Sequence, residues 1–410
     1  MNNKREFYKL LVSSFVSQSG SHFLTLALSA FILVSSGSPI QAALVFVVSY
    51  FPSILVSSRL GHWVDTRLSR FLLARNELIS IFSTVLCGVI IANKLPLVFL
   101  CIVLAMRSLL IFVTRAAAAK WIKLITPPEL QTGRIKLFYL SFFLSTALAG
   151  VLLGFTISKY SIWKIVAIDS FSYVVSAILI LTLVKLPKSQ YVDGNTGAVL
   201  HPHIFETLST IFKMPLVRNS FLVVCFSQSL FQGAYSVLVS YLPIQHFKTG
   251  FNGVGSFQIA ASIGITGGFL INWFWEKLFE EKRPEFPMKG LLIFSAAIIC
   301  LISTTNTEII SLSLGSFLLL NFFYECVWLH NSSEFFRASP KASAARYQFT
   351  LSACAAFFMS LSTLAYSMAI EYWGLNRGVL FVLAFSMIVV VMISVAARRS
   401  GEVTADGGHY

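Results

Sequence analysis

The stretch Gly61–Arg70 reads GHWVDTRLSR and places an aspartate and two arginines between two long apolar runs. Each flanking run has about 20 residues, which is the length of a helix that crosses the hydrocarbon core of a bilayer. A short charged turn between two such runs is typical of a chain that crosses a membrane and returns. The stretch therefore predicts a helical membrane protein.

The composition of the whole chain agrees with this interpretation. Hydrophobic residues make up 56% of the 410 residues and charged residues 12%, whereas soluble domains carry about 25% charged residues. The polar residues cluster at the ends of the apolar runs. The helices of a large soluble protein would instead need polar outer faces, so we exclude that class.

Twelve apolar runs are long enough to span a membrane. We expect the helices at about 8–34, 40–60, 71–92, 97–118, 135–158, 162–184, 217–245, 253–275, 288–304, 308–330, 347–371 and 376–396. Alternating the connections between two sides places 25 of the 31 Lys and Arg residues on one side and five on the other, with Arg107 inside a span. Because Lys and Arg gather on the cytoplasmic side, both termini are expected there.

The longest polar stretch divides the spans into six and six. We predict a six-helix bundle over residues 1–184, a cytoplasmic link with an amphipathic helix over 185–216, a second six-helix bundle over 217–396 and a cytoplasmic tail over 397–410. The two halves share a repeated motif, because SQS occurs at Ser17–Ser19 and again at Ser227–Ser229. Repeated halves with a site between them are a common plan of transporters.

The chain resembles the major facilitator superfamily. The resemblance covers about residues 10–395 and includes twelve spans, a link after the sixth and a charged turn between the second and third. The turn supplies Gly61, Asp65, Arg67 and Arg70 of the superfamily motif. The resemblance implies an all-α polytopic membrane protein whose twelve helices form two pseudo-symmetric six-helix bundles. It also implies that the first, fourth, seventh and tenth helices line a central cavity.

Within that superfamily, the chain is similar to the macrolide-efflux and enterobactin-exporter branch. The similarity lies in Arg107-Ser108, the segment LITPPEL after it, Glu77 at the start of the third span, AIDSFSY around Asp169, and Pro243 followed by GVGSFQIAASIG. This resemblance implies an exporter of a siderophore-like metabolite or a drug.

Polar residues recur at i, i+4 and i+7 in the first, seventh and tenth spans, which places each set on one helix face. The predicted lining of the substrate cavity is Gln18, His22, Thr25, Arg107, Thr114, Gln228, Gln232, Tyr235, Asn321, Glu325 and Trp328. Hydrogen bonding between helices is the alternative role of such residues.

Three charged residues lie deep inside predicted spans. Arg107 would cost ~2.5–3.5 kcal/mol in a bilayer without a partner, so it contacts either an anionic substrate group or an acid. A buried carboxyl group suits proton exchange, and we predict Glu325 as the coupling acid with Asp169 as the second candidate. Arg107 is expected to pair with Glu325 when no substrate is bound.

A conformational gate is expected around the charged turn. Its predicted residues are Gly61, Asp65, Arg67, Arg70 and Glu77. We interpret Glu77 as one half of a structural ion pair with the neighbouring Arg75.

The sequence favours a secondary transporter over an enzyme. It contains no G-x-x-x-x-G-K-[ST] motif for ATP, no catalytic constellation and no metal-ligand cluster, so no cofactor or metal is expected. The +14 net charge is spread over the connections, which argues against nucleic acid as a partner. The expected partners are a small-molecule substrate, protons and the lipid bilayer, for a monomer in a bacterial inner membrane. The alternatives are an importer of a small metabolite and a non-transporting receptor or lipid-handling protein on the same scaffold.

Overall fold

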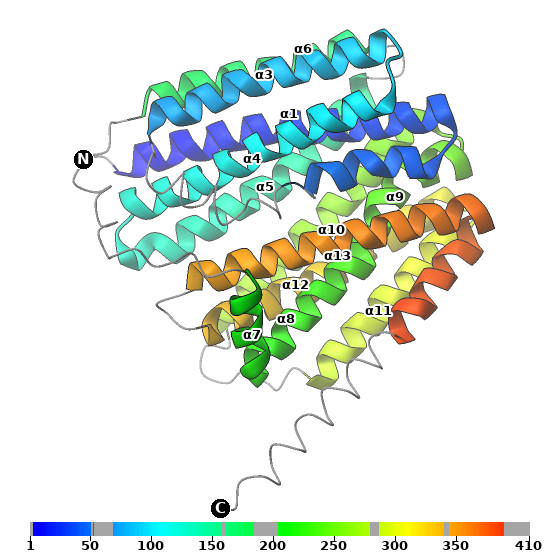
Figure 1. Cartoon of the computed structure of the whole chain (residues 1–410). Coiled ribbons are helices and arrows are strands. Elements are labelled where there is room, and N and C mark those ends of the chain that lie inside the picture. The colour runs from blue at the N-terminus through cyan, green and yellow to red at the C-terminus, as the bar shows by residue number, and fades with distance from the viewer. Residues whose placement is uncertain are drawn as a thin grey trace, which may run out of the picture.

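In the computed structural model, the described residues are 3–50, 52, 69–156, 161–183, 204–278, 287–339 and 344–388. Every regular element within these ranges is a helix (Figure 1). Eight helices are long and apolar enough to cross a membrane, and four shorter apolar helices lie at Pro39–Tyr50, Leu140–Gly154, Leu292–Asn306 and Leu375–Ile388. Together they follow the order of the twelve predicted spans, and the predicted all-α membrane fold is confirmed.

The first half of the chain forms one bundle. Its labelled helices are α1 (Asn3–Ser36), α3 (Arg70–Ala92), α4 (Leu97–Ile125), α5 (Pro128–Thr156) and α6 (Ile162–Leu181). The start of α3 is set by Ser69, whose side chain accepts a hydrogen bond from the Leu72 N–H group at 3.0 Å. Such a cap satisfies one of the donors that every helix leaves free at its N-terminus. Within this bundle α1 and α3 both pack against α6.

The second half forms the other bundle (Figure 1). Its elements are α7 (Ile204–Lys213), α8 (Pro215–Ser227), η2 (Gln228–Gln232), α9 (Gly233–Tyr241), η3 (Leu242–His246), α10 (Gly250–Leu278), α11 (Pro287–Asn306), α12 (Ile310–Ala338) and α13 (Ala344–Trp373). The short helix α7 buries Ile211 and leaves Phe205 exposed. It is fixed to α13 by a 3.0 Å hydrogen bond from the Tyr347 hydroxyl group to Thr210 Oγ1.

The seventh predicted span is a continuous membrane helix with two π-helical turns. The segments α8, η2, α9 and η3 together run over Pro215–His246. In η3, the Phe247 N–H group bonds to the carbonyl oxygen of Leu242, five residues back, at 2.8 Å. Pro243 lies in this turn and has no N–H group to donate. The turns change the direction of side chains along the span, which a uniform helical repeat does not predict.

The two bundles pack against each other along α5 and α10. A Cβ atom on Gly255 would lie 2.7 Å from both the carbonyl oxygen of Gly150 and the backbone nitrogen of Gly154. The glycines therefore let the two helix backbones touch. Beside them, Thr146 Oγ1 and Ser262 Oγ are 3.0 Å apart and share a hydrogen bond.

Further contacts join the bundles at the end away from the N-terminus (Figure 1). Glu371, at the end of α13, accepts hydrogen bonds from the Ser38 hydroxyl group at 2.6 Å and from the Ile40 N–H group at 3.2 Å. Ser29 in α1 and Ser240 in α9 are also within hydrogen-bond distance, at 3.3 Å. These bonds tie the two halves together on this side.

Candidate functional site

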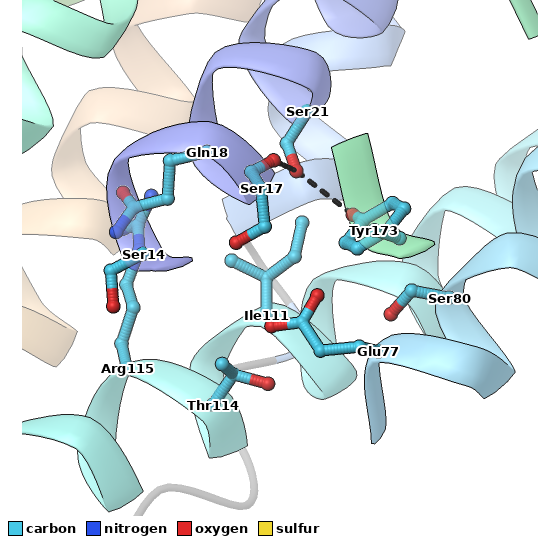
Figure 2. A pocket seen from close by; sticks show the side chains of 10 residues that line it. All are labelled: Ser14, Ser17, Gln18, Ser21, Glu77, Ser80, Ile111, Thr114, Arg115 and Tyr173. Carbon is cyan, nitrogen blue, oxygen red and sulfur yellow. Dashed lines mark hydrogen bonds between the residues drawn. The ribbon is translucent and has the colours of Figure 1, made fainter. Parts of the chain in front are cut away.

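A small polar pocket lies inside the first bundle, between α1, α3, α4 and α6 (Figure 2). Its lining residues are Ser14, Ser17, Gln18, Ser21, Glu77, Ser80, Ile111, Thr114, Arg115 and Tyr173. Ile111 is the one apolar member of this set. The cavity measures about 10 Å³, which is room for roughly one water molecule.

The wall contributed by α1 follows from the spacing of its polar residues. Ser14, Ser17, Gln18 and Ser21 stand at i, i+3, i+4 and i+7, which is one face of a helix. Ser21 Oγ lies 2.8 Å from the hydroxyl oxygen of Tyr173, which ties this face to α6 (Figure 2). The close approach depends on Gly20. A Cβ atom there would lie 2.1 Å from Ser172 Oγ.

Glu77 places a carboxyl group in this pocket from α3. Its residue exposure is 2%, and its Oε2 atom has no hydrogen-bond partner. The expected ion pair with Arg75 is wrong, because Arg75 is exposed on another face of α3. Each residue of an α-helix turns the chain by about 100°, so two residues that are two positions apart point about 200° apart. Glu77 is therefore a pocket residue.

The opposite wall comes from α4. The guanidinium carbon of half-buried Arg115 lies 4.1 Å from the ring centroid of Phe142 in α5. Thr114 Oγ1 accepts a hydrogen bond from the Asn76 amide at 3.1 Å, which connects α4 to α3. The pocket thus combines an acid and a base from neighbouring helices.

Arg107 lies beside the pocket but belongs to a buried ion pair. Its Nη2 atom is 2.7 Å from Asp169 Oδ2, and the two side chains are 2% and 0% exposed. Thr84 donates a 2.7 Å hydrogen bond to the same carboxylate oxygen and accepts one from Arg107. The guanidinium group also lies over the ring of Tyr173, at 5.1 Å from its centroid.

The expected pair between Arg107 and Glu325 is therefore not formed. Arg107 points towards α3 and α6 within its own bundle, where Asp169 is the nearest acid. A charge buried among apolar helices needs such a partner close by. Its place in an ion pair corrects the expectation that Arg107 lines the substrate cavity.

Glu325 is buried elsewhere, in the second bundle. It is 1% exposed, its Oε1 atom has no hydrogen-bond partner, and it packs against α10. A Cβ atom on Gly268 would lie 2.9 Å from the Glu325 Cβ atom. Asn321 bonds to its own helix through the Phe317 carbonyl oxygen at 2.8 Å, and Trp328 packs against the apolar core.

The polar residues of the seventh span do not form one face. The Gln228 side chain accepts a hydrogen bond from Tyr324 in α12, and its amide nitrogen lies 3.4 Å from the sulfur of Met359. Tyr235 instead bonds to Gln258 in α10. The π-helical segment η2 begins at Gln228 and ends at Gln232, so it separates the directions of these side chains.

Two predicted cavity residues of α1 lie outside the pocket. The His22 ring packs edge-on against Phe142, with 4.9 Å between ring centroids. Thr25 donates a 2.9 Å hydrogen bond to the Ser21 carbonyl oxygen of its own helix. Of the eleven predicted cavity residues, the structure brings Gln18 and Thr114 into the pocket.

Sequence reasoning misses most of the pocket. Seven lining residues are not among the predicted ones: Ser14, Ser17, Ser21, Ser80, Ile111, Arg115 and Tyr173. The serine spacing on α1 is a usable signal. The Lys and Arg count assigns Arg115 to the connection after the fourth span, whereas Arg115 lies inside α4, which continues to Ile125.

The predicted gate is described in part. Gly61, Asp65 and Arg67 lie outside the described residues. Arg70 donates hydrogen bonds to the carbonyl oxygens of Leu181 at 3.2 Å and Leu183 at 2.8 Å. Positive groups are favourable at this C-terminal end of α6, where the carbonyl groups carry partial negative charge.

The described residues contain no group of three or more His, Cys, Asp or Glu side chains that could hold a metal ion. The six cysteines are free.

Comparison with known proteins places this geometry in a family. Solved structures with the same fold include a bacterial homologue of the human lysosomal transporter Spinster, inward-facing and unoccupied, at 15% identity and a TM-score of 0.71 over 97% of each chain. A mutant of the nucleoside transporter NupG has 12% identity and a TM-score of 0.72, over 96% of this chain and 99% of that one. A POT family transporter in complex with a thioalcohol-conjugated peptide has 14% identity and a TM-score of 0.71, over 96% of each chain.

These identities are low, so the likeness shows the fold alone. No curated protein matches the chain. The sequence model of the Major Facilitator Superfamily matches residues 10–363, which is most of the 410 residues. The chain therefore belongs to the Major Facilitator Superfamily and is a multi-pass membrane transporter.

Proposed function

We propose that this transporter exports a small organic molecule from the cytoplasm in exchange for protons, by alternating access. The observation that carries the proposal is a buried carboxyl group in each half, Glu77 and Glu325, each with one oxygen atom that has no hydrogen-bond partner. Isolated acids inside membrane spans are costly and mark ion or proton pathways. One proton that moves down 100 mV supplies ~2.3 kcal/mol for transport.

The two unpaired acids are better coupling candidates than Asp169. Asp169 is held by Arg107 at 2.7 Å and by Thr84, so a change in its protonation would leave a buried arginine without its partner. Glu325 and Glu77 have no such basic partner at ion-pair distance among the described residues.

The direction and the substrate class are supported by resemblance. Arg107-Ser108, LITPPEL and AIDSFSY are similar to the macrolide-efflux and enterobactin-exporter branch, so a drug or a siderophore-like metabolite is the proposed cargo. The ion pair of Arg107 removes it as the contact for an anionic group.

The proposed conformation is inward-facing. The bonds of Glu371 to Ser38 and Ile40 join the halves at one end. The distribution of Lys and Arg predicts that this end is extracellular and that both termini are cytoplasmic. We place the protein, as a monomer, in a bacterial inner membrane.

The test uses everted membrane vesicles from cells that express the protein and from cells that do not. The probes are radiolabelled erythromycin and enterobactin, with an acidic lumen imposed or collapsed by nigericin. The expected result is accumulation of one probe that requires both the protein and the pH gradient. Accumulation that ignores the gradient, or no protein-dependent accumulation of either probe, would contradict the proposal. Gradient-driven uptake into right-side-out vesicles alone would instead support the importer.

A further inference from the structure

The polar pocket of the first bundle has the features of a hydrated acid site. We infer that it is the proton-binding site of the transporter, in which Glu77 takes up and releases the exchanged proton through one bound water molecule. The inference rests on the proposed proton exchange and assigns it to a residue. It draws on the cavity, its unsatisfied acceptors and the surrounding charges.

Two acceptor atoms of the pocket are unsatisfied. Gln18 Oε1 and Glu77 Oε2 are both buried, and neither has a hydrogen-bond partner. Both side chains line the same cavity, from α1 and α3 (Figure 2). A buried acceptor without a partner is costly, and a water molecule in the cavity can donate a hydrogen bond to such an acceptor. The cavity of about 10 Å³ holds roughly one such water.

The walls of the cavity suit the movement of a proton. The hydroxyl groups of Ser14 and Ser17 line it beside Gln18, and a hydroxyl group can both donate and accept a hydrogen bond. The bound water is therefore surrounded by groups that can reorient with it. When a hydronium ion reaches this position, its O–H bond breaks, a new O–H bond forms on Glu77 Oε2, and a neutral water remains. Release is the reverse step.

The other buried acids lack this setting. Asp169 is engaged by Arg107 and Thr84. Glu325 packs against Gly268 at the contact of α12 with α10 and is not among the lining residues of the pocket. Glu77, in contrast, lines the cavity inside the first bundle.

Charged and titratable groups on the neighbouring helices surround Glu77. From α4 these are Arg107 and Arg115, and from α6 they are Asp169 and Tyr173. The face of α1 at the pocket contributes hydroxyl groups and the Gln18 amide. Asp169 and Arg107 form an ion pair with each other, so each balances the charge of the other.

The test compares Glu77→Gln with Glu325→Gln and with Glu308→Gln, whose carboxyl group is exposed in the connection between α11 and α12. Infrared difference spectra between acidic and alkaline pH are recorded on each purified protein in lipid, so no substrate is needed. We expect a titrating band of a buried carboxyl group in the wild type that is lost only in Glu77→Gln. Gln18→Leu should shift the frequency of that band, because it removes one partner of the bound water.

Transport of the probe that the wild type accumulates is measured on the same variants. Glu77→Gln should lose gradient-driven accumulation and retain exchange of labelled for unlabelled probe. If Glu77→Gln fails to fold, Glu77→Asp serves instead and should shift the infrared band. A wild type without gradient-driven transport would overturn the proposed function. A coupled wild type whose band and coupling survive in Glu77→Gln would overturn the site alone.

Discussion

Arg107 and Asp169 form a buried ion pair that joins α4 to α6, with 2.7 Å between Nη2 and Oδ2. Thr84 of α3 bonds to both partners, so the pair connects three helices of the first bundle. Two residues that the sequence marked as functional candidates thus satisfy each other's charge. Among the described residues of the first bundle, Glu77 remains as a buried acid with an oxygen atom that has no hydrogen-bond partner.

The ion pair should be worth more as a pair than its members are singly. Arg107→Leu leaves Asp169 buried without its positive partner, which is expected to cost about 3–5 kcal/mol of stability. Arg107→Leu combined with Asp169→Leu should recover much of that loss. The apparent melting temperature of the purified protein in detergent measures both effects. A double variant no more stable than the single variant would show that the two charges do not depend on each other.

The contact between α5 and α10 should not tolerate a single added methyl group. A Cβ atom on Gly255 would lie 2.7 Å from backbone atoms of Gly150 and Gly154. Gly255→Ala is therefore expected to cost about 1–3 kcal/mol, as overpacking does, and to slow transport. Gly315→Ala is the matched control, since nothing lies within 4 Å of an added Cβ atom there. Equal melting temperatures and transport rates for the two variants would contradict this contact.

The hydrogen bonds of Glu371 hold the two bundles together at one end, and we expect that they must break during transport. Ser38→Cys with Glu371→Cys, in a background without native cysteines, is expected to be cross-linked by a short bis-methanethiosulfonate reagent, because the native side chains are 2.6 Å apart and the reagent makes up for the shorter Cys side chain. The cross-link should stop transport, and dithiothreitol should restore it. Each single cysteine variant is the control. Continued transport by the fully cross-linked protein would mean that this end need not open.

The topology follows from the distribution of Lys and Arg. Single cysteines at Asp193 and Gly250, in the same background, are exposed to an impermeant thiol reagent on intact cells. Position 250 should be labelled, and position 193 should be labelled only after the cells are opened. The reverse pattern would place the Lys- and Arg-rich side outside, against the preference of these residues for the cytoplasm.

The order of the membrane helices could be predicted from the sequence because hydropathy alone sets which segments cross a bilayer. The partner of Arg107 could not be predicted from the sequence. The spacing within one helix shows that Arg107 must have a partner, but the rotation of α4 against α6 selects Asp169. The Gln228–Tyr235 stripe failed for a different reason. A π-helical turn between these residues breaks the 3.6-residue repeat on which the prediction depends.

The lining of the pocket could also be predicted only in part. The spacing of Ser14, Gln18 and Ser21 indicates a polar face on α1, but the sequence gives no sign of the helices that meet it. Proximity in the chain suggests a pair between Glu77 and Arg75. The actual surroundings of Glu77 come from α1, α4 and α6, which are far away in sequence.

The central claim is that substrate efflux and proton entry are one exchange. The most direct measurement is the pH gradient of everted vesicles, followed with an acridine dye while erythromycin or enterobactin is added. Vesicles with the wild-type protein should lose part of the gradient when the transported compound is added, and vesicles with Glu77→Gln should not. A gradient that stays unchanged in the wild type while the compound accumulates would contradict the claim.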